Sequence, residues 1–319
     1  MLRLLVAIAC LSSIVATAQT TAWPTHPIKV VVPAPAGGPY DRIMRPLAQK
    51  MATSLGQPLV IDNRPSAGNI VGTQFGASAA PDGYTLTMTG MLNTIAHGMY
   101  DKVPFDIAKD FEPVGAIGEG AQWLIVRSDS GIASLSDLLA KAKTAPGTVD
   151  YASSGAGSTG HLLMELLQRA AKVQLTHVPY KGGAPALQDV LAGVVAVMII
   201  PPNAAQASVR SGKLRVIAVS SARRSPAWMD VPTFAELGYP DLTVSSWVGL
   251  SAPKGTPVAV VDKLNAALNE ALNDKALLQQ LDAEGLTPLR TTPKQYGDLV
   301  VKDLNRWSAL VRSLGLRAN

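Results

Sequence analysis

The sequence predicts an α/β protein with two domains. Apolar runs of strand length alternate with amphipathic helical stretches through most of the chain, and this alternation is typical of largely parallel sheets covered by helices on both faces. The pattern changes near Pro257, where the chain becomes helical after one last apolar strand. A late strand followed by terminal helices indicates that the chain returns to its first domain. About 300 residues remain once the N-terminal segment is set aside, enough for two domains of ordinary size.

The predicted strands are short runs rich in valine, isoleucine and leucine. In chain order they cover residues 28–32, 59–61, 84–88, 123–126, 149–152, 175–178, 196–200, 214–219 and, last, 244–250.

Helices are predicted where apolar residues recur at helical spacing, at 43–55, 135–142, 162–170, 187–191, 258–268, 276–281 and 293–314. Ser134 and Asp137 form a capping-box-like start for one of them. Pro185 suits the first turn of another.

The N-terminus has the pattern of a secretory signal. Arg3 precedes an apolar run at residues 4–15, and Ala16-Thr17-Ala18 is a small-residue cleavage site. The run is too short to span a bilayer, so we expect cleavage near Ala18 and a periplasmic product. A lipid anchor on Cys10 is the alternative, but the segment before it is very short. Cys10 is the single cysteine, so disulfides and thiol catalysis are excluded for the mature chain.

Composition argues against nucleic acid as a partner. The net charge is +5 with aromatic residues at 5%, and the basic residues are scattered rather than grouped in a patch. A modest positive field suits a small anionic ligand. No later apolar run reaches membrane-spanning length, so we expect a soluble product.

Residues 149–170 are the most informative stretch, because a strand, a small-residue turn and a helix follow one another. Gly155, Gly157 and Gly160 match a dinucleotide-binding pattern, but no carboxylate ends the next strand. The same glycines nearly form a phosphate loop, yet His161 stands where lysine is required. Residues 156–160 resemble a nucleophile elbow without its first glycine. An anion-binding turn and a tight turn without ligand therefore both remain open.

The enzyme alternative is an exported serine hydrolase that uses Ser158. In an α/β-hydrolase the acid and then the histidine follow the nucleophile. His161 and His177 follow Ser158, but neither lies in the late loop where that histidine belongs. No metalloprotease motif and no carboxylate cluster with calcium-loop spacing occurs, so we expect no metal and no cofactor.

Many short motifs occur in a fixed order along the chain: WP (23–24), PIKVVVP (27–33), GGPYD (37–41), GQP (56–58), DNRP (62–65), GNI (68–70), APDGYTL (80–86), YASSG (151–155), HVPYKG (177–182), GKLR (212–215), DVPT (230–233) and APKGTP (252–257). With them, the chain resembles the periplasmic substrate-binding proteins of tripartite tricarboxylate transporters, also called Bug receptors, from Trp23 to about Leu316.

The resemblance implies a two-lobed periplasmic binding protein of type II, a Venus flytrap, with a ligand in the cleft and two crossover segments as the hinge. We place the crossovers near 123–127 and 244–250, so that 23–124 and 250–319 form lobe 1 and 125–249 form lobe 2. The implied partner is a membrane permease, and we expect the receptor to be a monomer.

One departure from the family bears on the ligand. Members commonly carry an aspartate in a Gly-x-Val-Asp pattern, whereas this chain has Ala196 at that place, and Asn203 stands near where a serine is common. Loss of a carboxylate from the cleft removes a partner for a ligand amine. The departure favours a plain mono- or dicarboxylate, aliphatic or aromatic, over an amino acid.

Two small-residue helix entrances are the predicted cradles for carboxylates, one in each lobe. The predicted ligand-binding residues are Gly37, Gly38, Pro39, Tyr40, Asn93, Thr94, Ser153, Ser154, Gly155, Gly157, Ser158, Thr159, Lys181 and Asn203.

Structural roles compete with ligand binding for several residues. For Asp41 we favour a helix cap over a ligand contact, and for His161 a packed position over catalysis. For Asn93 and Thr94, helix capping and ligand binding are equal alternatives. For Lys181 we favour an exposed side chain without a ligand contact. Trp247 fits either the core or the cleft wall.

Overall fold

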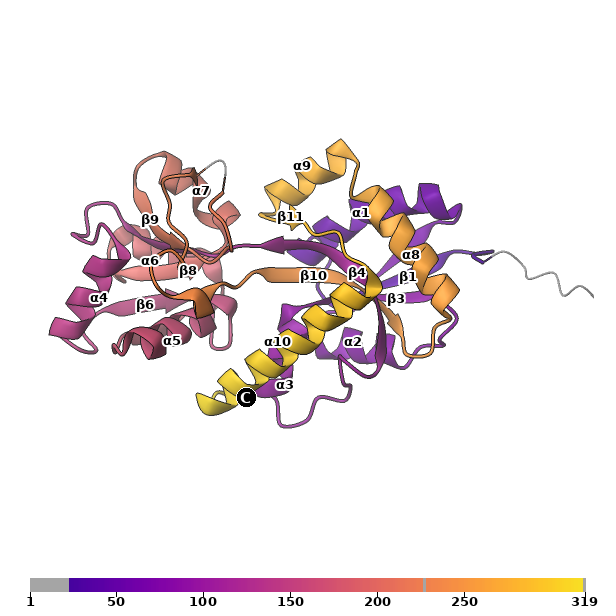
Figure 1. Ribbon diagram of the computed structural model, residues 1–319, viewed down its shortest axis with the longest axis horizontal. Helices are drawn as coiled ribbons and strands as arrows, with labels where there is room; N and C mark the ends of the chain where they lie inside the picture. Colours follow the sequence, from indigo (N-terminus) through magenta and orange to yellow (C-terminus); the bar gives the residue numbers. More distant parts are fainter. Residues whose placement is uncertain (1–22, 226–227, 318–319) are drawn as a thin grey trace, which may run out of the picture.

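The computed structural model describes residues 23–225 and 228–317. Within them, two sheets form the centres of two lobes that lie side by side (Figure 1). The predicted leader and its cleavage near Ala18 lie outside the described residues. No helix of the described part of the chain is long and apolar enough to cross a membrane.

Lobe 1 is built on a six-stranded sheet in the order β11-β4-β10-β3-β1-β2. β1 runs parallel to β2 and β3, whereas β10 is antiparallel to β3 and β4. Four of the five residues of β1 are buried, as expected for a strand covered on both faces. The strands are β1 (Ile28–Val32), β2 (Leu59–Asn63), β3 (Thr85–Gly90), β4 (Phe111–Gly120), β10 (Ser246–Pro253) and β11 (Thr287–Pro288).

Lobe 2 is built on a five-stranded sheet in the order β7-β6-β8-β5-β9. β6 runs parallel to β7 and β8, and β5 is antiparallel to β8 and β9. The strands are β5 (Trp123–Arg127), β6 (Asp150–Ser153), β7 (Thr176–Pro179), β8 (Val197–Ile200) and β9 (Leu214–Val219).

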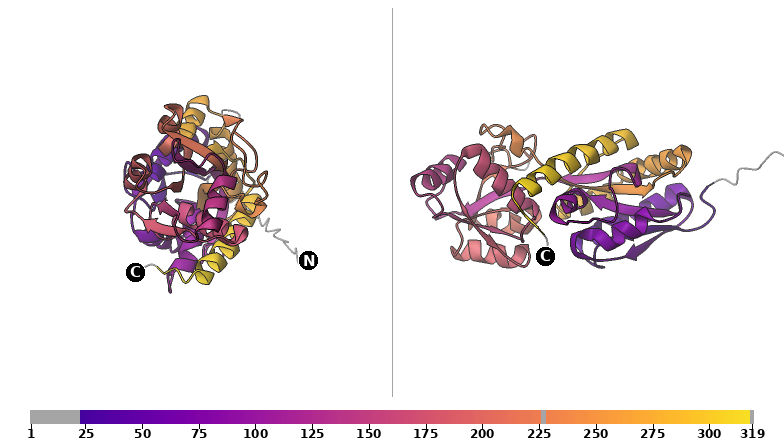
Figure 2. Two further views of the ribbon diagram at one scale, coloured as in Figure 1. Left: turned by 90° about the vertical axis from the view of Figure 1, so that its left-hand side faces the viewer. Right: turned by 90° about the horizontal axis from the view of Figure 1, so that it is seen from below.

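Helices cover both faces of each sheet (Figures 1 and 2). Lobe 1 carries α1 (Pro39–Leu55), η1 (Ala67–Asn69), α2 (Ile70–Ala77), α3 (Met91–Met99), α8 (Val258–Ala271), α9 (Lys275–Ala283) and α10 (Pro293–Ser313). Lobe 2 carries α4 (Leu135–Thr144), α5 (Thr159–Ala171), α6 (Gly183–Ala192), α7 (Pro202–Arg210) and η3 (Pro240–Leu242).

The two helix starts that were predicted from particular residues are confirmed. The Ser134 hydroxyl accepts the Asp137 N–H at 3.2 Å, and Asp137 accepts the Ala133 N–H at 3.0 Å. Pro185 lies in the first turn of α6. The return of the chain to lobe 1 is also confirmed, because β10 and β11 pair with strands of the first sheet.

The expectation of largely parallel sheets is corrected by the crossing strands. β10 and β5 each enter a sheet from the side of the other lobe, so each runs antiparallel to its neighbours. The ten-residue strand β4 was not predicted, because its three glycines and one proline are unfavourable in strands.

The two crossovers meet at Ser220. Its N–H donates to the carbonyl of Gln122 at 2.9 Å, and its hydroxyl accepts the Gln122 N–H at 2.8 Å. The same hydroxyl donates to the carbonyl of Val244 at 2.5 Å. One serine therefore joins both segments that connect the lobes.

Strand pairing corrects the predicted lobe boundaries by a few residues. Trp123 and Leu124 pair with β8 of lobe 2, and residues 246–249 pair with β4 of lobe 1. The crossovers are thus residues 121–122 and 244–245. The predicted crossovers followed the apolar runs at 123–127 and 244–250, and most of these residues belong to the strands β5 and β10.

Helix α10 packs mainly on α3 and β4 and reaches lobe 2 near its end (Figure 2). There Nη1 of Arg169, on α5, donates to the Ser313 hydroxyl at 2.8 Å. One apolar cluster includes Ile95 of α3, Leu162 of α5 and Trp307 of α10. The lobes therefore share a core on the side of α3, α5 and α10.

Candidate functional site

The turn between β6 and α5 has the geometry predicted for a small-residue helix entrance. Gly155 and Gly157 have φ of 130° and 76°, a region that favours glycine. Ser158 caps α5, and its hydroxyl accepts the N–H of His161 at 3.4 Å. The N–H groups of Thr159 and Gly160 precede the first intrahelical bond and have no acceptor within the helix. These groups form the positive end of α5.

Two stacked imidazoles support this turn from within lobe 2. The Gly157 N–H donates to Nδ1 of His161 at 3.0 Å, and the Ser153 hydroxyl lies 2.7 Å from Nε2 of His177. The two rings are nearly parallel, and their centroids are 4.0 Å apart. Burial lowers the pKa of both imidazoles to about 4, with a contribution from His161 in the case of His177. Both are therefore neutral at pH 7, and Nδ1 of His161 is an acceptor.

A cavity of about 430 Å³ lies between the lobes beside this turn. Lobe 2 contributes residues 154–158. Lobe 1 contributes Gly68 and Asn69, together with residues of α3 and its C-cap, and the C-terminal segment contributes Arg317. The α3 residues are Leu92, Ile95, Ala96 and Met99, and the C-cap is Tyr100.

Asn69 is the most informative lining residue. It has φ of 60°, a left-handed conformation that asparagine tolerates better than most residues. The residue is 9% exposed, and its Nδ2 has no hydrogen-bond partner in the described part of the chain. A buried donor without a partner costs about 1–3 kcal/mol. Nδ2 itself has almost no accessible surface and lies near the buried hydroxyl of Tyr40, so it is not exposed to the cavity.

The lobe 1 turn at Gly37–Tyr40 does not line this cavity. The Gly37 N–H donates to Oδ2 of Asp41 at 2.8 Å, and the Gly38 N–H donates to the carbonyl of Pro35 at 3.1 Å. Asp41 is 2% exposed and also accepts from Arg45 and Asn63. The carboxylate at this helix entrance is therefore supplied by the chain itself.

Asp41 has a structural role, but the predicted helix cap is wrong: its carboxylate accepts the Gly37 N–H before the helix, and no side chain caps the start of α1. Tyr40 turns its hydroxyl inward, where a Cβ at Gly90 would lie 2.5 Å from it. Burial raises the pKa of Tyr40.

The remaining predicted residues fall into two groups. Asn93 and Thr94 are fully buried, where Oδ1 of Asn93 accepts the Gly90 N–H at 2.9 Å and the Thr94 hydroxyl donates to the Met91 carbonyl at 2.7 Å. Both therefore have capping roles at the start of α3. Lys181 is exposed, and Asn203 lies against Gly285 of lobe 1, outside the cavity.

The geometry also bears on Ser158 and Trp247. The hydrogen bond of the Ser158 hydroxyl joins it to a backbone N–H rather than to an imidazole. Trp247 is 2% exposed, and its Nε1 donates to Oδ2 of Asp303 at 2.5 Å, so it belongs to the core. Burial raises the pKa of Asp303.

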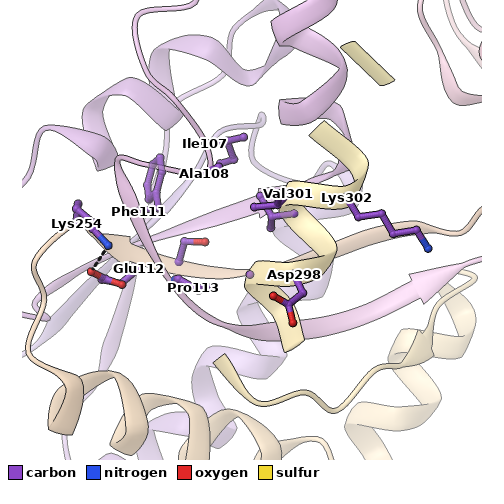
Figure 3. A pocket seen from close by; sticks show the side chains of 12 residues that line it. Ile107, Ala108, Phe111, Glu112, Pro113, Lys254, Asp298, Val301 and Lys302 are labelled. Carbon is purple, nitrogen blue, oxygen red and sulfur yellow. Dashed lines mark ion pairs between the residues drawn. The ribbon is translucent and has the colours of Figure 1, made fainter. Parts of the chain in front are cut away.

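A second cavity of about 370 Å³ lies in lobe 1 between the start of β4 and α10 (Figure 3). Its edge carries the Lys254–Glu112 ion pair, with 2.8 Å between Nζ and Oε1, while Val301 and Lys302 approach from α10. All of its lining residues belong to lobe 1. A movement of the two lobes would therefore not enclose a ligand there.

No group of three or more His, Cys, Asp or Glu side chains among residues 23–225 and 228–317 is placed to hold a metal ion.

Sequence reasoning missed the lobe 1 side of the cavity. Leu92, Ile95, Ala96 and Met99 have helical spacing in the sequence, but the predicted helices did not include this segment. Asn69 was noted as part of a family motif without a role. The signal that could have found it is an asparagine next to a glycine before a helix, where a left-handed residue is common.

Two α/β lobes joined by two crossovers, with a cavity between them, define a two-lobed binding protein. Residues 43–316 match the family model described as the tripartite tricarboxylate transporter family receptor. The chain is 38% identical to the protein BugT of Bordetella pertussis (strain Tohama I) over 96% of this chain and 94% of that protein. The chain therefore belongs to the tripartite tricarboxylate transporter receptor family.

Solved structures agree with the fold. MatC from Rhodopseudomonas palustris with bound malate is 34% identical, with a TM-score of 0.73 over 91% of this chain and 100% of that one. Rpa4515 of R. palustris with adipate is 32% identical, with a TM-score of 0.76 over 93% of this chain and 100% of that one.

Proposed function

We propose that the chain is an exported solute receptor that binds a small organic carboxylate between its lobes and delivers it to a membrane permease. The observation that carries this proposal is the interlobe cavity, whose lobe 2 side is formed by residues 154–158 of the small-residue turn that leads into the positive end of α5. A helix entrance with free N–H groups favours an anion. The malate in MatC and the adipate in Rpa4515 support a carboxylate as the ligand class.

The ligand carboxylate would accept hydrogen bonds from the N–H of Thr159 and from the hydroxyls of Ser154 and Ser158. Ser158 would keep its capping bond, because the hydroxyl oxygen can accept the His161 N–H while the hydroxyl proton is donated to the ligand. Charge-assisted bonds of this kind contribute about 1.5–3 kcal/mol each. Binding would draw the lobes together about the crossovers at 121–122 and 244–245, as a shift from open to closed molecules.

Export to the periplasm, cleavage near Ala18 and action as a monomer belong to the same proposal. The leader pattern at residues 3–18 supports export. Mass spectrometry of the mature protein tests the cleavage, and a lipid-bearing N-terminus at Cys10 would contradict it.

Calorimetry on the mature protein with a panel of mono-, di- and tricarboxylates tests the binding function. Two serine-to-alanine variants form a matched pair, because Ser158 and Ser134 both cap helices of lobe 2 and only Ser158 lines the cavity. Each change is expected to lower stability by about 1 kcal/mol. Ser158→Ala should also weaken carboxylate binding by about 1–2 kcal/mol, whereas Ser134→Ala should not.

Equal affinity of both variants would show that the ligand lies elsewhere. The hydrolase alternative predicts a different result, in which Ser158→Ala binds normally and abolishes ester turnover. Absence of binding across the whole panel would refute the carboxylate receptor.

A further inference from the structure

We propose that helix α10 clamps the two lobes together on one side, so that they open and close on the other side, between α7 and α9. Figure 1 shows α5 and α10 on one side of the crossovers and α7 and α9 on the other. This inference rests on the proposed function and specifies the movement that would enclose a ligand. It depends on where the described residues join the lobes.

The C-terminal end of α10 is bonded to lobe 2. Nη1 of Arg169, on α5, donates to the Ser313 hydroxyl at 2.8 Å, and Nη2 donates to the Ser313 carbonyl at 3.2 Å. Ser313 is the last residue of α10, so the guanidinium satisfies a carbonyl that has no partner within the helix. One side chain of lobe 2 therefore holds the end of a lobe 1 helix.

The middle of α10 holds both ends of the second crossover. The guanidinium of Arg306 donates from Nη1 to the carbonyl of Thr243 at 3.4 Å and from Nη2 to the carbonyl of Asp241, just before the crossover. One turn earlier on α10, Asp303 accepts the bond from Nε1 of Trp247, just after the crossover. A movement that pulled lobe 2 away from α10 would have to break these contacts.

The apolar packing between the lobes lies on the same side. The cluster that joins the lobes contains Leu162 of α5, Leu242 of η3, and Trp307 and Val311 of α10, and these four side chains are fully buried. Separation of the lobes here would expose them to water, which is unfavourable. In the part of the chain that the structure describes, the buried residues of each other apolar cluster belong to one lobe.

The α7–α9 side has a much smaller contact. Asn203, near the start of α7, lies against Gly285, just after α9, where a Cβ would be 3.2 Å from the asparagine side chain. Among residues 23–225 and 228–317, no hydrogen bond or ion pair joins the lobes on this side, whereas Arg169 and Arg306 do so at α10. Lobes that share little interface are expected to move relative to each other.

The lobes are thus joined at the two crossovers and along the second half of α10. A rotation that keeps all of these connections must widen or narrow the gap between α7 and α9. Ile95 and Met99 line the cavity and belong to the cluster that joins the lobes. This part of the cavity would therefore keep its shape during the movement.

Distances between pairs of spin labels test the clamp without a ligand. Cys10 is the single cysteine and lies in the predicted leader, so introduced cysteines are the labelled ones in the mature protein. Four exposed alanines suit this purpose. Ala140→Cys on α4 with Ala309→Cys on α10 spans the clamped side, and Ala207→Cys on α7 with Ala276→Cys on α9 spans the other. Electron double resonance should give a narrower distance distribution for the α4–α10 pair than for the α7–α9 pair, and equally wide distributions would refute the clamp.

Arginine variants assign the restraint to α10. Arg169→Ala and Arg306→Ala should each broaden the distribution of the α4–α10 pair, whereas Arg312→Ala, at an exposed arginine of the same helix, should not. Arg169 is exposed, so its replacement leaves the cores of both lobes intact. Unchanged widths in the folded Arg169 and Arg306 variants would refute the clamp.

Adipate and malate separate this inference from the proposed function. Whichever of them binds in calorimetry should shift the mean distance of the α7–α9 pair by more than about 2 Å, the scale of a domain rearrangement, and leave the α4–α10 pair unchanged. Equal shifts in both pairs would refute the clamp and leave the carboxylate receptor intact. Binding of neither acid, nor of any other carboxylate of the panel, would refute the receptor function, while the widths measured without ligand would still decide the clamp.

Discussion

The buried imidazole of His161 makes the stability of lobe 2 depend on pH. In the folded protein its Nδ1 accepts the Gly157 N–H, and burial lowers its pKa to about 4 from 6.5. The folded state therefore binds fewer protons than the unfolded state between these two values. Stability contributed by neutral His161 is fully present above pH 6.5 and is lost as the pH falls toward 4.

The magnitude follows from the two pKa values. Integrating the proton uptake gives a loss of about 2 kcal/mol between pH 7 and pH 5, and about 3 kcal/mol by pH 4. His161→Asn is a suitable comparison, because the asparagine oxygen can accept the Gly157 N–H but does not titrate in this range. The difference in unfolding free energy between the two proteins should shift by these amounts in favour of the variant as the pH falls.

Two measurements check this. Urea denaturation at several pH values between 7 and 4.5 gives the unfolding free energies. NMR titration of the imidazole C–H signals gives the pKa directly, and with four histidines in the chain single substitutions suffice to assign them. A folded protein in which His161 titrates near pH 6.5, or identical pH dependence of both proteins, would refute the reasoning.

Three further predictions concern packing and closure. Gly160→Ala places a Cβ 2.3 Å from the carbonyl of Ile199 and should destabilise the protein by about 1–3 kcal/mol in urea, whereas Gly183→Ala, with its nearest neighbour at 3.9 Å, should not. Trp247→Phe removes the donor to buried Asp303 and should cost about 1.5–3 kcal/mol at pH 7; an unchanged urea midpoint would contradict it. Small-angle scattering should give a smaller radius of gyration when a tight ligand saturates the protein, and an unchanged radius would count against closure.

The sequence was sufficient to predict the elements whose start and end depend on residues close together in the chain. β1 and β9 begin and end where their apolar runs do, since both are buried runs bounded by polar or turn residues. The Ser134 cap was predictable because one side chain and one N–H a few residues away make it. β4 was not predictable, since Gly118 and Gly120 read as strand breakers. Their reason is tertiary, because a Cβ at either would lie 2.9 Å from a carbonyl of the segment 285–287.

The site divides in the same way. The α5 entrance could be predicted from Gly155, Gly157 and Ser158, because backbone conformation and helix capping depend on residues that are close in the sequence. The opposite wall could not, because Asn69 and α3 reach the cavity only through the packing of the two lobes. For the lobe 1 turn, the sequence showed Asp41 beside the glycines but not that its carboxylate would accept the Gly37 N–H; ligand binding at this turn stays a prediction.

The attachment of both crossovers to Ser220 has a consequence for how such a receptor changes over time. In the proposed closure, a substitution at this junction would alter the balance of open and closed molecules before any ligand is present, and so would multiply the affinity for every ligand by the same factor. A substitution on a cavity wall instead changes the affinity for one ligand relative to another. Sensitivity to scarce solute and choice of solute are thus encoded at separate places in this chain, and each can be altered while the other is kept.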